Sequence, residues 1–369
     1  MPIASSRDCP RSEVKPPDRA KAQRQILVVK LDGIGDLALA LPALRGMADR
    51  LPHAAIDLVV SPLNSGWGEL LPWVRRVYVV DFPAYRATRK GRLSKLRIVP
   101  DLGWLALRLL RSRYDAAIDL RTAHGDWRGK LVTFLSRARR RIGGTGNGTW
   151  MLTDIVPDKA MHQGDVLLER LRALLPDLEP SFDHIVNVSR TSPGGPVRHI
   201  LLHPGAGVPS KKWPAENWVE LASELRHRTG SVSFQFIGGK GDADDIRSLC
   251  ESAHLPMKSQ IIAQSLREAL EQIAKCDLLV GLDSAAPHLA ALVGTPCVTI
   301  FSAANEPARW RALGRNDILH YPVPCSPCRL ANCKLLTHLC MESITVRQVL
   351  AALDAALART PVPLAPGPQ

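Results

Sequence analysis

The segment Leu31–Asp36 has the residue types of a ligand-binding turn, with two glycines and two aspartates in six residues. It follows the apolar run Ile26–Val29 and precedes a helical pattern from Leu37 to about Leu51. A buried strand, a tight turn and a helix N-terminus place backbone N–H groups and an acidic side chain at the carboxyl edge of a parallel sheet. Asp36 then has two candidate roles: a helix-capping acid, or a general base that accepts a proton from a hydroxyl group.

The second half of the chain contains comparable turns. The predicted strand His199–His203 is followed by a turn with Ala206 and Gly207, and Lys211 stands before the next helical pattern. Such a turn can present N–H groups and a positive charge to a diphosphate, although an ordinary loop with exposed lysines gives the same pattern. Asp242 follows another predicted strand and a Gly-Gly turn, where it can accept a hydrogen bond from a ribose hydroxyl group or cap a helix.

A third turn follows the predicted strand that begins at Leu278. Asp283, Ser284 and Ala285 stand where a helix begins, and free N–H groups at such a position can hold a phosphate. His288 lies one turn further along an otherwise apolar helix. It is either a residue that positions the ligand or a histidine of the apolar core.

Strand and helix patterns alternate along the chain, which predicts an α/β protein with parallel sheets. In the first half the predicted strands are Ile56–Val60, Val77–Val80 and Ala116–Leu120, the predicted helix is Leu102–Leu110, and Arg139–Gly144 is expected to close a further helix. We expect a loose basic tail at 1–24, a first domain at 25–190, a linker at 191–197, a second domain at 198–343, a closing helix at 344–358 and a loose tail at 359–369. The first tail lacks the apolar segment of a signal peptide, and no run of about 18 apolar residues predicts a membrane span.

The chain has a net charge of +13, and most of this positive charge lies in its first half. Residues 1–190 contain 31 Lys and Arg residues and 20 Asp and Glu residues, whereas residues 191–369 contain 17 and 15. Residues 86–97 and 137–141 are basic runs without acids. A solvated helix face would explain these runs, and so would an anionic membrane surface or a phosphorylated acceptor. Nucleic acid is not an expected partner, because no zinc-finger, RRM or KH pattern accompanies the cations.

Four of the eight cysteines cluster near the end of the chain. Cys325, Cys328, Cys333 and Cys340 have the spacing C-x2-C-x4-C-x6-C. Four thiolates can bind zinc or iron and stabilise an irregular loop, whereas two disulfides or four free thiols are the alternatives. The scattered remaining cysteines are typical of a reduced, cytoplasmic protein.

Three sets of residues occur in a recognisable order: Val29–Asp36 with Leu41–Leu44, His203–Ala206 with Lys211–Pro214, and Asp283–Ala290. Together they resemble the heptosyltransferase-type enzymes of glycosyltransferase family 9, which transfer heptose from ADP-heptose to the lipopolysaccharide core. The resemblance extends over roughly residues 25–358. It implies a GT-B architecture, in which two Rossmann-like domains face a cleft, with the acceptor on the first domain and the nucleotide sugar on the second.

The resemblance also implies roles for individual residues. Asp36 matches the general base of an inverting displacement. The donor-binding candidates are Ala206, Gly207, Lys211, Asp242, Asp283, Ser284, Ala285 and His288, and the acceptor-binding candidates are Arg92, Lys95, Arg97, Arg121 and Arg128. Ala285 departs from the family pattern, in which glycine is usual at this position. A β-carbon there could crowd the phosphate or prevent a positive φ.

The expected donor is ADP-heptose and the expected acceptor is a phosphorylated glycolipid. The chemistry needs no metal cofactor, because lysine and helix N-terminal amides can stabilise a leaving ADP. A similar four-cysteine iron finger in some relatives implies a structural metal in the cysteine loop. We expect the protein in the cytoplasm, or peripheral to the inner membrane. The alternatives are a nucleotide-sugar epimerase of GT-B shape, an inactive basic binding protein, and a transferase whose acceptor is a protein.

Overall fold

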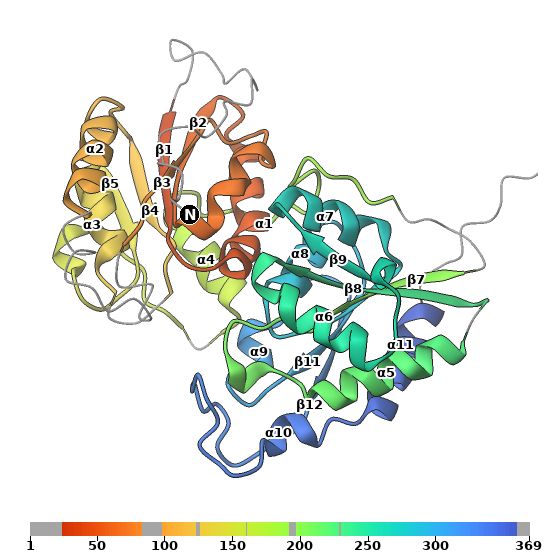
Figure 1. The fold of residues 1–369 in the computed structure, drawn as a ribbon. Helices are drawn as coiled ribbons and strands as arrows, with labels where there is room; N and C mark the ends of the chain where they lie inside the picture. The colour runs from red at the N-terminus through yellow and green to blue at the C-terminus, as the bar shows by residue number, and fades with distance from the viewer. Residues whose placement is uncertain are drawn as a thin grey trace, which may run out of the picture.

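The structure is a computed structural model that describes residues 24–82, 98–122, 126–159, 161–191, 197–228 and 230–359, without the side chains of 98–101. Two α/β lobes lie side by side (Figure 1). Three of the expected acceptor residues, Arg92, Lys95 and Arg97, lie outside the described residues. So do residues 1–23 of the expected tail 1–24, residues 360–369 of the expected tail 359–369, and most of the expected linker.

The first lobe is built on a parallel six-stranded sheet with the order β3-β2-β1-β4-β5-β6. Its strands are β1 (Arg24–Lys30), β2 (Ala54–Val60), β3 (Arg76–Val79), β4 (Ala116–Asp119), β5 (Arg140–Gly143) and β6 (Asp154–Ile155). Its helices are α1 (Ile34–Arg50), α2 (Ile98–Leu110), α3 (Arg128–Leu135) and α4 (Gln163–Arg172), with 3-10 turns η1 (Pro62–Glu69) and η4 (Thr149–Met151).

The second lobe repeats this plan with the strand order β12-β11-β10-β7-β8-β9, again parallel. Its strands are β7 (Arg198–His203), β8 (Val232–Gly239), β9 (Gln260–Ala263), β10 (Leu278–Leu282), β11 (Cys297–Phe301) and β12 (Asn316–His320). Its helices are α5 (Ala215–His227), α6 (Ala243–Ser252), α7 (Leu266–Lys275), α8 (Ala285–Leu292), α9 (Pro307–Trp310), α10 (Leu339–Glu342) and α11 (Val346–Ala358), with 3-10 turns η5 (Pro209–Lys211), η6 (Lys240–Asp242) and η7 (Met257–Ser259). The predicted pair of Rossmann-like units is confirmed.

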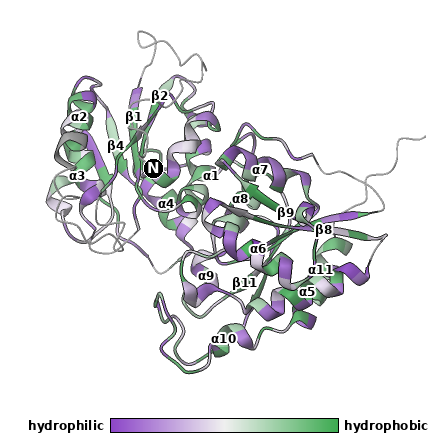
Figure 2. Ribbon diagram, in the orientation of Figure 1, coloured by the Kyte–Doolittle hydropathy of each residue, from purple (hydrophilic) through white to green (hydrophobic). Residues whose placement is uncertain are grey.

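Strand β1 shows why the sheets are covered on both faces. Alternate side chains of a strand point to opposite faces, so Ile26 and Val28 pack with α1, whereas Leu27 and Val29 pack with α2 and α3. All four are fully buried. Hydrophobic residues accordingly gather on the strands and on the inward faces of the helices (Figure 2). No helix of the described residues combines the length and the apolar character needed to cross a membrane.

One local prediction differs from the structure. The segment Arg139–Gly144 was expected to close a helix, but Arg140–Gly143 is strand β5, between β4 and β6. Its arginines are tolerated there because Arg140 pairs with Asp154 and Arg141 donates to the Met151 carbonyl group. The closing helix α11 packs against α5 and strands β10 to β12 of its own lobe.

The lobes meet where α1 packs against α8. A β-carbon on Gly35 would lie 3.0 Å from Cδ2 of His288 and 3.3 Å from Cα of Ala285, so glycine permits this close approach. A second contact is made by His162, whose Nε2 donates to the Arg311 carbonyl group at 2.9 Å, since its Nδ1 accepts the Gly164 N–H group. The turn that carries Asp36 therefore faces the second lobe.

Candidate functional site

Asp36 lies in the first turn of α1, where its side chain accepts a hydrogen bond from the Gly33 N–H group at 3.1 Å. This capping contact fixes the carboxyl group at the carboxyl edge of β1. Burial raises the pKa of the Asp36 carboxyl group, and the charge of Asp32 adds to the shift, whereas Lys30, the Gly33 N–H group and Lys211 act against it. A carboxylate whose proton affinity is raised is suited to general-base chemistry.

The neighbouring Asp32 has a different environment. Its carboxylate accepts hydrogen bonds from Lys30 Nζ at 2.8 Å and from Arg121 Nε at 3.1 Å, and all three side chains are buried. Burial alone would raise the pKa of Asp32, but Lys30 and Arg121 together hold it below its usual range. Asp32 is thus an ion-paired scaffold carboxylate, while Asp36 makes no ion pair among the described residues.

The second lobe contributes a cation to the same region. Lys211 ends the turn η5, and its Nζ lies 2.7 Å from Oδ2 of Asp283 at the end of β10. Asn305 Nδ2 donates to the same carboxylate oxygen at 2.7 Å. Asp283 directly precedes the N-cap of α8, and α1 approaches that helix at Gly35, so the Lys211 ammonium group lies beside the junction of the two lobes. Its charge acts to lower the pKa of both Asp36 and His288.

Ser210, which the sequence did not single out, anchors Lys211 to the cysteine loop. The Ser210 N–H group donates to the Ala331 carbonyl group at 3.0 Å, and its hydroxyl group donates to the Leu330 carbonyl group. The Ser210 carbonyl group accepts a hydrogen bond from Nε2 of His338 at 3.0 Å. These partners are more than 100 residues away in sequence, so no local pattern could have indicated them.

The N-terminus of α8 holds three of the predicted donor residues. Ser284 is the N-cap residue, and its buried hydroxyl oxygen lacks a hydrogen-bond partner, as does Nδ1 of His288. Burial lowers the pKa of His288 to about 4, so the ring is neutral at pH 7. Ala285 is the first helical residue and is not among the described residues with positive φ, so its backbone does not require glycine. Unpaired polar atoms, free helix N–H groups and Lys211 together suit an anion.

Asp242 caps the turn after β8, where it accepts a hydrogen bond from the Gly239 N–H group at 2.9 Å. It also packs against Gly205, where a β-carbon would lie 2.5 Å from its Oδ1. Asp242 therefore joins the turns after β7 and β8. In the first of these turns Ala206 is half-buried, whereas Gly207 is exposed, with open space where a β-carbon would stand.

A cavity of about 230 Å³ opens at the carboxyl edge of the first sheet. Arg121 and Arg128 line it together with Phe82, and both arginines bind the carboxylate of Asp126. The Arg128 guanidinium group also lies over the Phe82 ring, 5.9 Å from its centre. Two predicted acceptor residues therefore border one cavity near the turn of Asp36.

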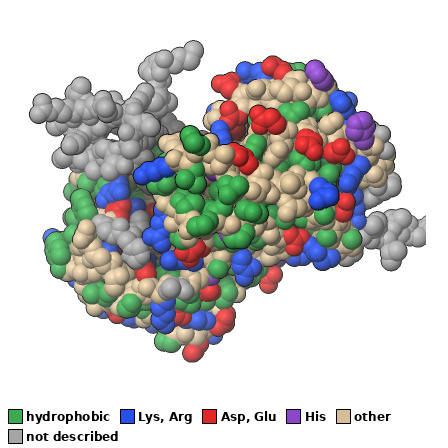
Figure 3. Space-filling model, turned by 90° about the horizontal axis from the view of Figure 1, so that it is seen from below, with side chains coloured by type: hydrophobic (Ala, Val, Ile, Leu, Met, Phe, Trp, Pro, Cys, Tyr) green, Lys and Arg blue, Asp and Glu red, His purple; other side chains and the backbone are tan. Residues whose placement is uncertain are grey.

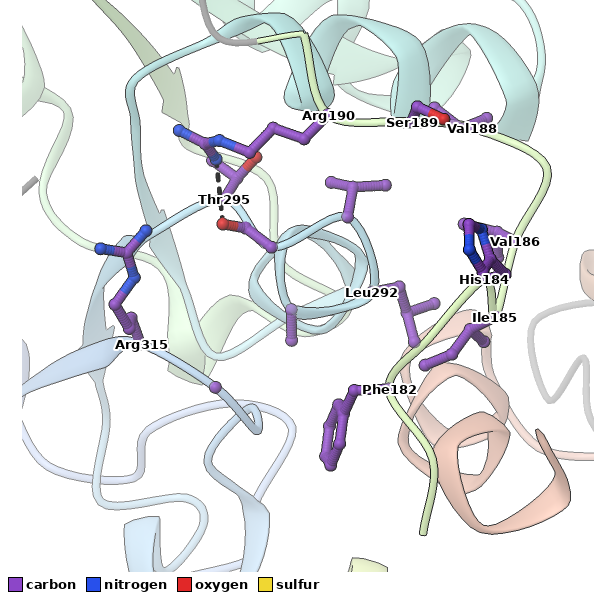
Figure 4. Close-up of a pocket in the computed structure, with 14 residues that line it drawn as sticks. Phe182, His184, Ile185, Val186, Val188, Ser189, Arg190, Leu292, Thr295 and Arg315 are labelled. Carbon is purple, nitrogen blue, oxygen red and sulfur yellow. Dashed lines mark hydrogen bonds between the residues drawn. The ribbon is translucent and has the colours of Figure 1, made fainter. Parts of the chain in front are cut away.

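A larger cavity of about 450 Å³ lies at the other end of α8, between the segment 182–190 and the residues around Gly294 and Arg315 (Figure 4). Arg190 donates to the Gly294 carbonyl group there at 3.0 Å. None of the predicted site residues lines this cavity.

Asp119 lies at the end of β4, close to Arg121, and should make the free energy of unfolding depend on pH. Burial raises the pKa of its carboxyl group from 3.8 to about 6, although Arg170 opposes the shift. The folded protein thus retains a proton that the unfolded chain loses near pH 4, so this group stabilises the fold at low pH and loses that contribution as pH rises through 6. The shift corresponds to about 3 kcal/mol.

We expect Asp119→Asn to remove this fall in the free energy of unfolding between about pH 4 and pH 6. Urea unfolding of parent and variant across that range measures it. Asp154→Asn is the matched control, because the hydrogen bond from Arg140 lowers the pKa of Asp154, so its effect on stability changes below about pH 4 and the fall between pH 4 and pH 6 should remain in this variant. Parallel curves for the parent and Asp119→Asn would contradict the assignment.

The structure does not support the expected metal site in the cysteine loop. No three His, Cys, Asp or Glu side chains within the described part of the chain are grouped so that they could hold a metal ion. Cys325, Cys328, Cys333 and Cys340 are free thiols in the structure, as in one of the predicted alternatives. Cys340 belongs to the buried core of the second lobe, and His338 is bonded to Ser210. The loop packs through Cys340 and forms backbone hydrogen bonds from Cys328 and Arg329 to Ala303 and Ala304.

Comparison with known proteins agrees with this geometry. The chain is 27% identical to lipopolysaccharide heptosyltransferase 1 of Pseudomonas aeruginosa over 330 residues, which cover 84% of this chain and 87% of that protein. Its fold is similar to a glycosyltransferase of family 9 from Veillonella parvula (TM-score 0.69, 20% identity, 92% and 98% coverage) and to E. coli heptosyltransferase WaaC with ADP-2-deoxy-2-fluoro heptose (TM-score 0.68, 17% identity, 90% and 99% coverage). Residues 104–338 match the family described as glycosyltransferase family 9 (heptosyltransferase). The protein therefore belongs to glycosyltransferase family 9 and has the GT-B fold of two facing Rossmann-like domains.

Proposed function

We propose that this glycosyltransferase transfers a heptose from ADP-heptose to a phosphorylated sugar of the lipopolysaccharide core, with inversion at the transferred carbon. The observation that carries the proposal is the meeting of two complementary groups at the lobe junction. Asp36 of the first lobe has a raised pKa and makes no ion pair among the described residues, and the Lys211 charge of the second lobe acts on it. One group suits a hydroxyl nucleophile and the other a diphosphate.

In the proposed mechanism Asp36 accepts the proton of the acceptor hydroxyl group as its oxygen attacks the anomeric carbon. The bond from that carbon to the diphosphate breaks on the opposite face, and ADP leaves. Lys211, the Ser284 hydroxyl group and the first N–H groups of α8 stabilise the developing charge on the diphosphate, without a need for a divalent metal. Asp283 and Asn305 hold Lys211 in place, and neutral His288 positions the donor.

The cavity bordered by Arg121 and Arg128 is the proposed acceptor site. Because Asp126 already binds both guanidinium groups, an incoming phosphate would add to an ordered network. Guanidinium groups bind phosphate through paired hydrogen bonds. A lipid-linked acceptor would bring the enzyme to the inner face of a membrane, which is the location we propose.

We expect Arg128→Met to raise the KM for a phosphorylated acceptor about 10- to 100-fold, because one charged hydrogen-bonding group is lost. The methionine stem should still cover Phe82, and the KM for the donor should remain unchanged. Steady-state kinetics with each substrate varied in turn measures both values. Arg347→Met, on the exposed face of α11, is the control, and an equal KM for parent and Arg128→Met would remove Arg128 from the acceptor site.

The test of the function is release of ADP from ADP-heptose in the presence of a phosphorylated core acceptor, with the product examined by mass spectrometry. A mass increase of one heptose supports the transferase. Consumption of the nucleotide sugar without acceptor, to give an isomeric sugar, would instead support the epimerase of GT-B shape. Binding of ADP without turnover of any acceptor would support the inactive binding protein. Transfer of heptose to a protein would show that the acceptor is a protein and not a glycolipid.

A further inference from the structure

The face of the first lobe that points away from the second lobe is covered by α2 and α3 (Figure 1). Both helices bury their inner sides in one core, to which Leu105 and Leu109 of α2 and Val132 of α3 belong. We call their outward side the outer face. It lies on the opposite side of the sheet from α1, and so it is free of the lobe junction.

The outer face exposes large apolar side chains. Trp104, Leu107 and Leu110 of α2, Phe134 of α3 and Trp150 of η4 expose between 42% and 72% of their surface. Phe134 and Trp150 form an edge-to-face pair with ring centres 5.6 Å apart. Clustered exposed groups of this size mark an interaction site rather than ordinary surface.

The same face is positively charged. The segments that form it, residues 102–114 and 128–153, contain no Asp or Glu. Five of their cations are exposed, namely Arg108, Arg111, Arg113, Arg137 and Arg139. The cations alternate with the aromatic rings, because Arg108 lies over Trp104 at 5.2 Å and Arg141 lies over Phe134 at 5.8 Å. By contrast, acidic and basic side chains lie next to each other on the second lobe (Figure 3, right).

We propose that the outer face is a membrane-docking surface for a bilayer that contains anionic phospholipids. Arginines pair with lipid phosphates, tryptophans lie at the headgroup level, and Leu107 and Leu110 enter the acyl boundary. A second copy of the chain is disfavoured as the occupant, because two outer faces would oppose positive charge to positive charge. A nucleic acid offers phosphates but no hydrocarbon for the leucines.

This inference deepens the proposed function, since it rests on that function's lipid-linked acceptor for its biological meaning. The physical argument from exposure and charge stands without it. Docking through α2 and α3 would leave Asp36 and the cavity bordered by Arg121 and Arg128 unobstructed, because both lie at the carboxyl edge of the sheet, whereas these helices cover one of its faces.

The test is co-sedimentation of the full chain with vesicles. The parent should bind vesicles of equal parts phosphatidylglycerol and phosphatidylcholine, should bind phosphatidylcholine vesicles poorly, and should dissociate as salt increases. Leu107→Ser with Leu110→Ser should weaken binding about tenfold or more, because buried hydrocarbon is lost. Arg108→Gln with Arg111→Gln should weaken it about 25-fold, at about fivefold per arginine.

Matched controls are Met257→Ser and Arg347→Gln, which alter exposed side chains of the second lobe and should bind like the parent. The two outer-face variants change different residues, so if one of them fails to fold, vesicle binding by the other still tests the proposal. Unchanged binding in a folded outer-face variant would overturn the proposal, as would equal binding to neutral vesicles. The proposal would also be overturned if the parent formed a dimer in the absence of vesicles and these variants were monomeric. Tighter binding of the parent to a single-stranded oligonucleotide than to the anionic vesicles would overturn it as well.

The outcomes separate this inference from the proposed function. Asp36→Asn should lose sugar transfer but keep vesicle binding. The outer-face variants should lose vesicle binding but keep the parental rate on a de-acylated, soluble acceptor. If no acceptor is glycosylated while anionic vesicles bind through the outer face, only the proposed function fails.

Discussion

Asp36→Asn should lower kcat about 100- to 10,000-fold, with little change in the KM for either substrate. Asparagine has nearly the same shape as aspartate, and its amide oxygen can still accept the hydrogen bond from the Gly33 N–H group that Asp36 receives. The fold should therefore persist, and the loss should report proton transfer. Single-turnover measurements on saturated enzyme provide the rate of the chemical step.

The pH profile gives this prediction a second readout. Burial raises the pKa of Asp36, so the parental kcat/KM should fall on the acidic side at a pH above the ordinary aspartate value of 3.8. Asp49→Asn is the matched control, because Asp49 belongs to the same helix and pairs with Arg45 on its surface. If Asp36→Asn retained parental activity, Asp36 would be a capping residue only, and the transferase mechanism would need another base.

Lys211→Met should lower kcat/KM about 100- to 1,000-fold, because the leaving diphosphate loses a cation placed at the lobe junction. Lys212→Met is the neighbouring control. The Lys212 ammonium group pairs with the exposed Asp245, so its removal should change kcat/KM little. Kinetics with ADP-heptose as the varied substrate compares the two variants.

A double variant separates two explanations of the Lys211 effect. Lys211 lies 2.7 Å from Asp283, so its loss also leaves a buried carboxylate without its cation. Lys211→Met with Asp283→Asn removes both charges. Recovery of activity in this double variant would show that Lys211 serves only to neutralise Asp283, whereas a persistently low kcat/KM supports direct action on the donor.

The fold could be predicted from local patterns to a large extent. Strand β1, its turn and helix α1 follow from an apolar run, paired glycines and a helical apolar period, all within 27 residues. The same holds for β10 and α8. The prediction of a helix closed by Arg139–Gly144 was wrong because arginine occurs readily in helices, and only the pairing of β5 with β4 and β6 gives the segment its extended form.

The sequence by itself determined where a carboxylate, a lysine and a helix N-terminus meet the edges of two sheets. Such placement is a short-range property, set by the few residues of each strand, turn and helix. Only the tertiary structure decided that Gly35 lets α1 approach α8, that Ser210 holds Lys211 through residues more than 100 positions away, and that Arg121 binds Asp32. It also decided which apolar side chains of α2 remain exposed. These are contacts between distant segments, and they depend on how the lobes and layers pack, which no local pattern records.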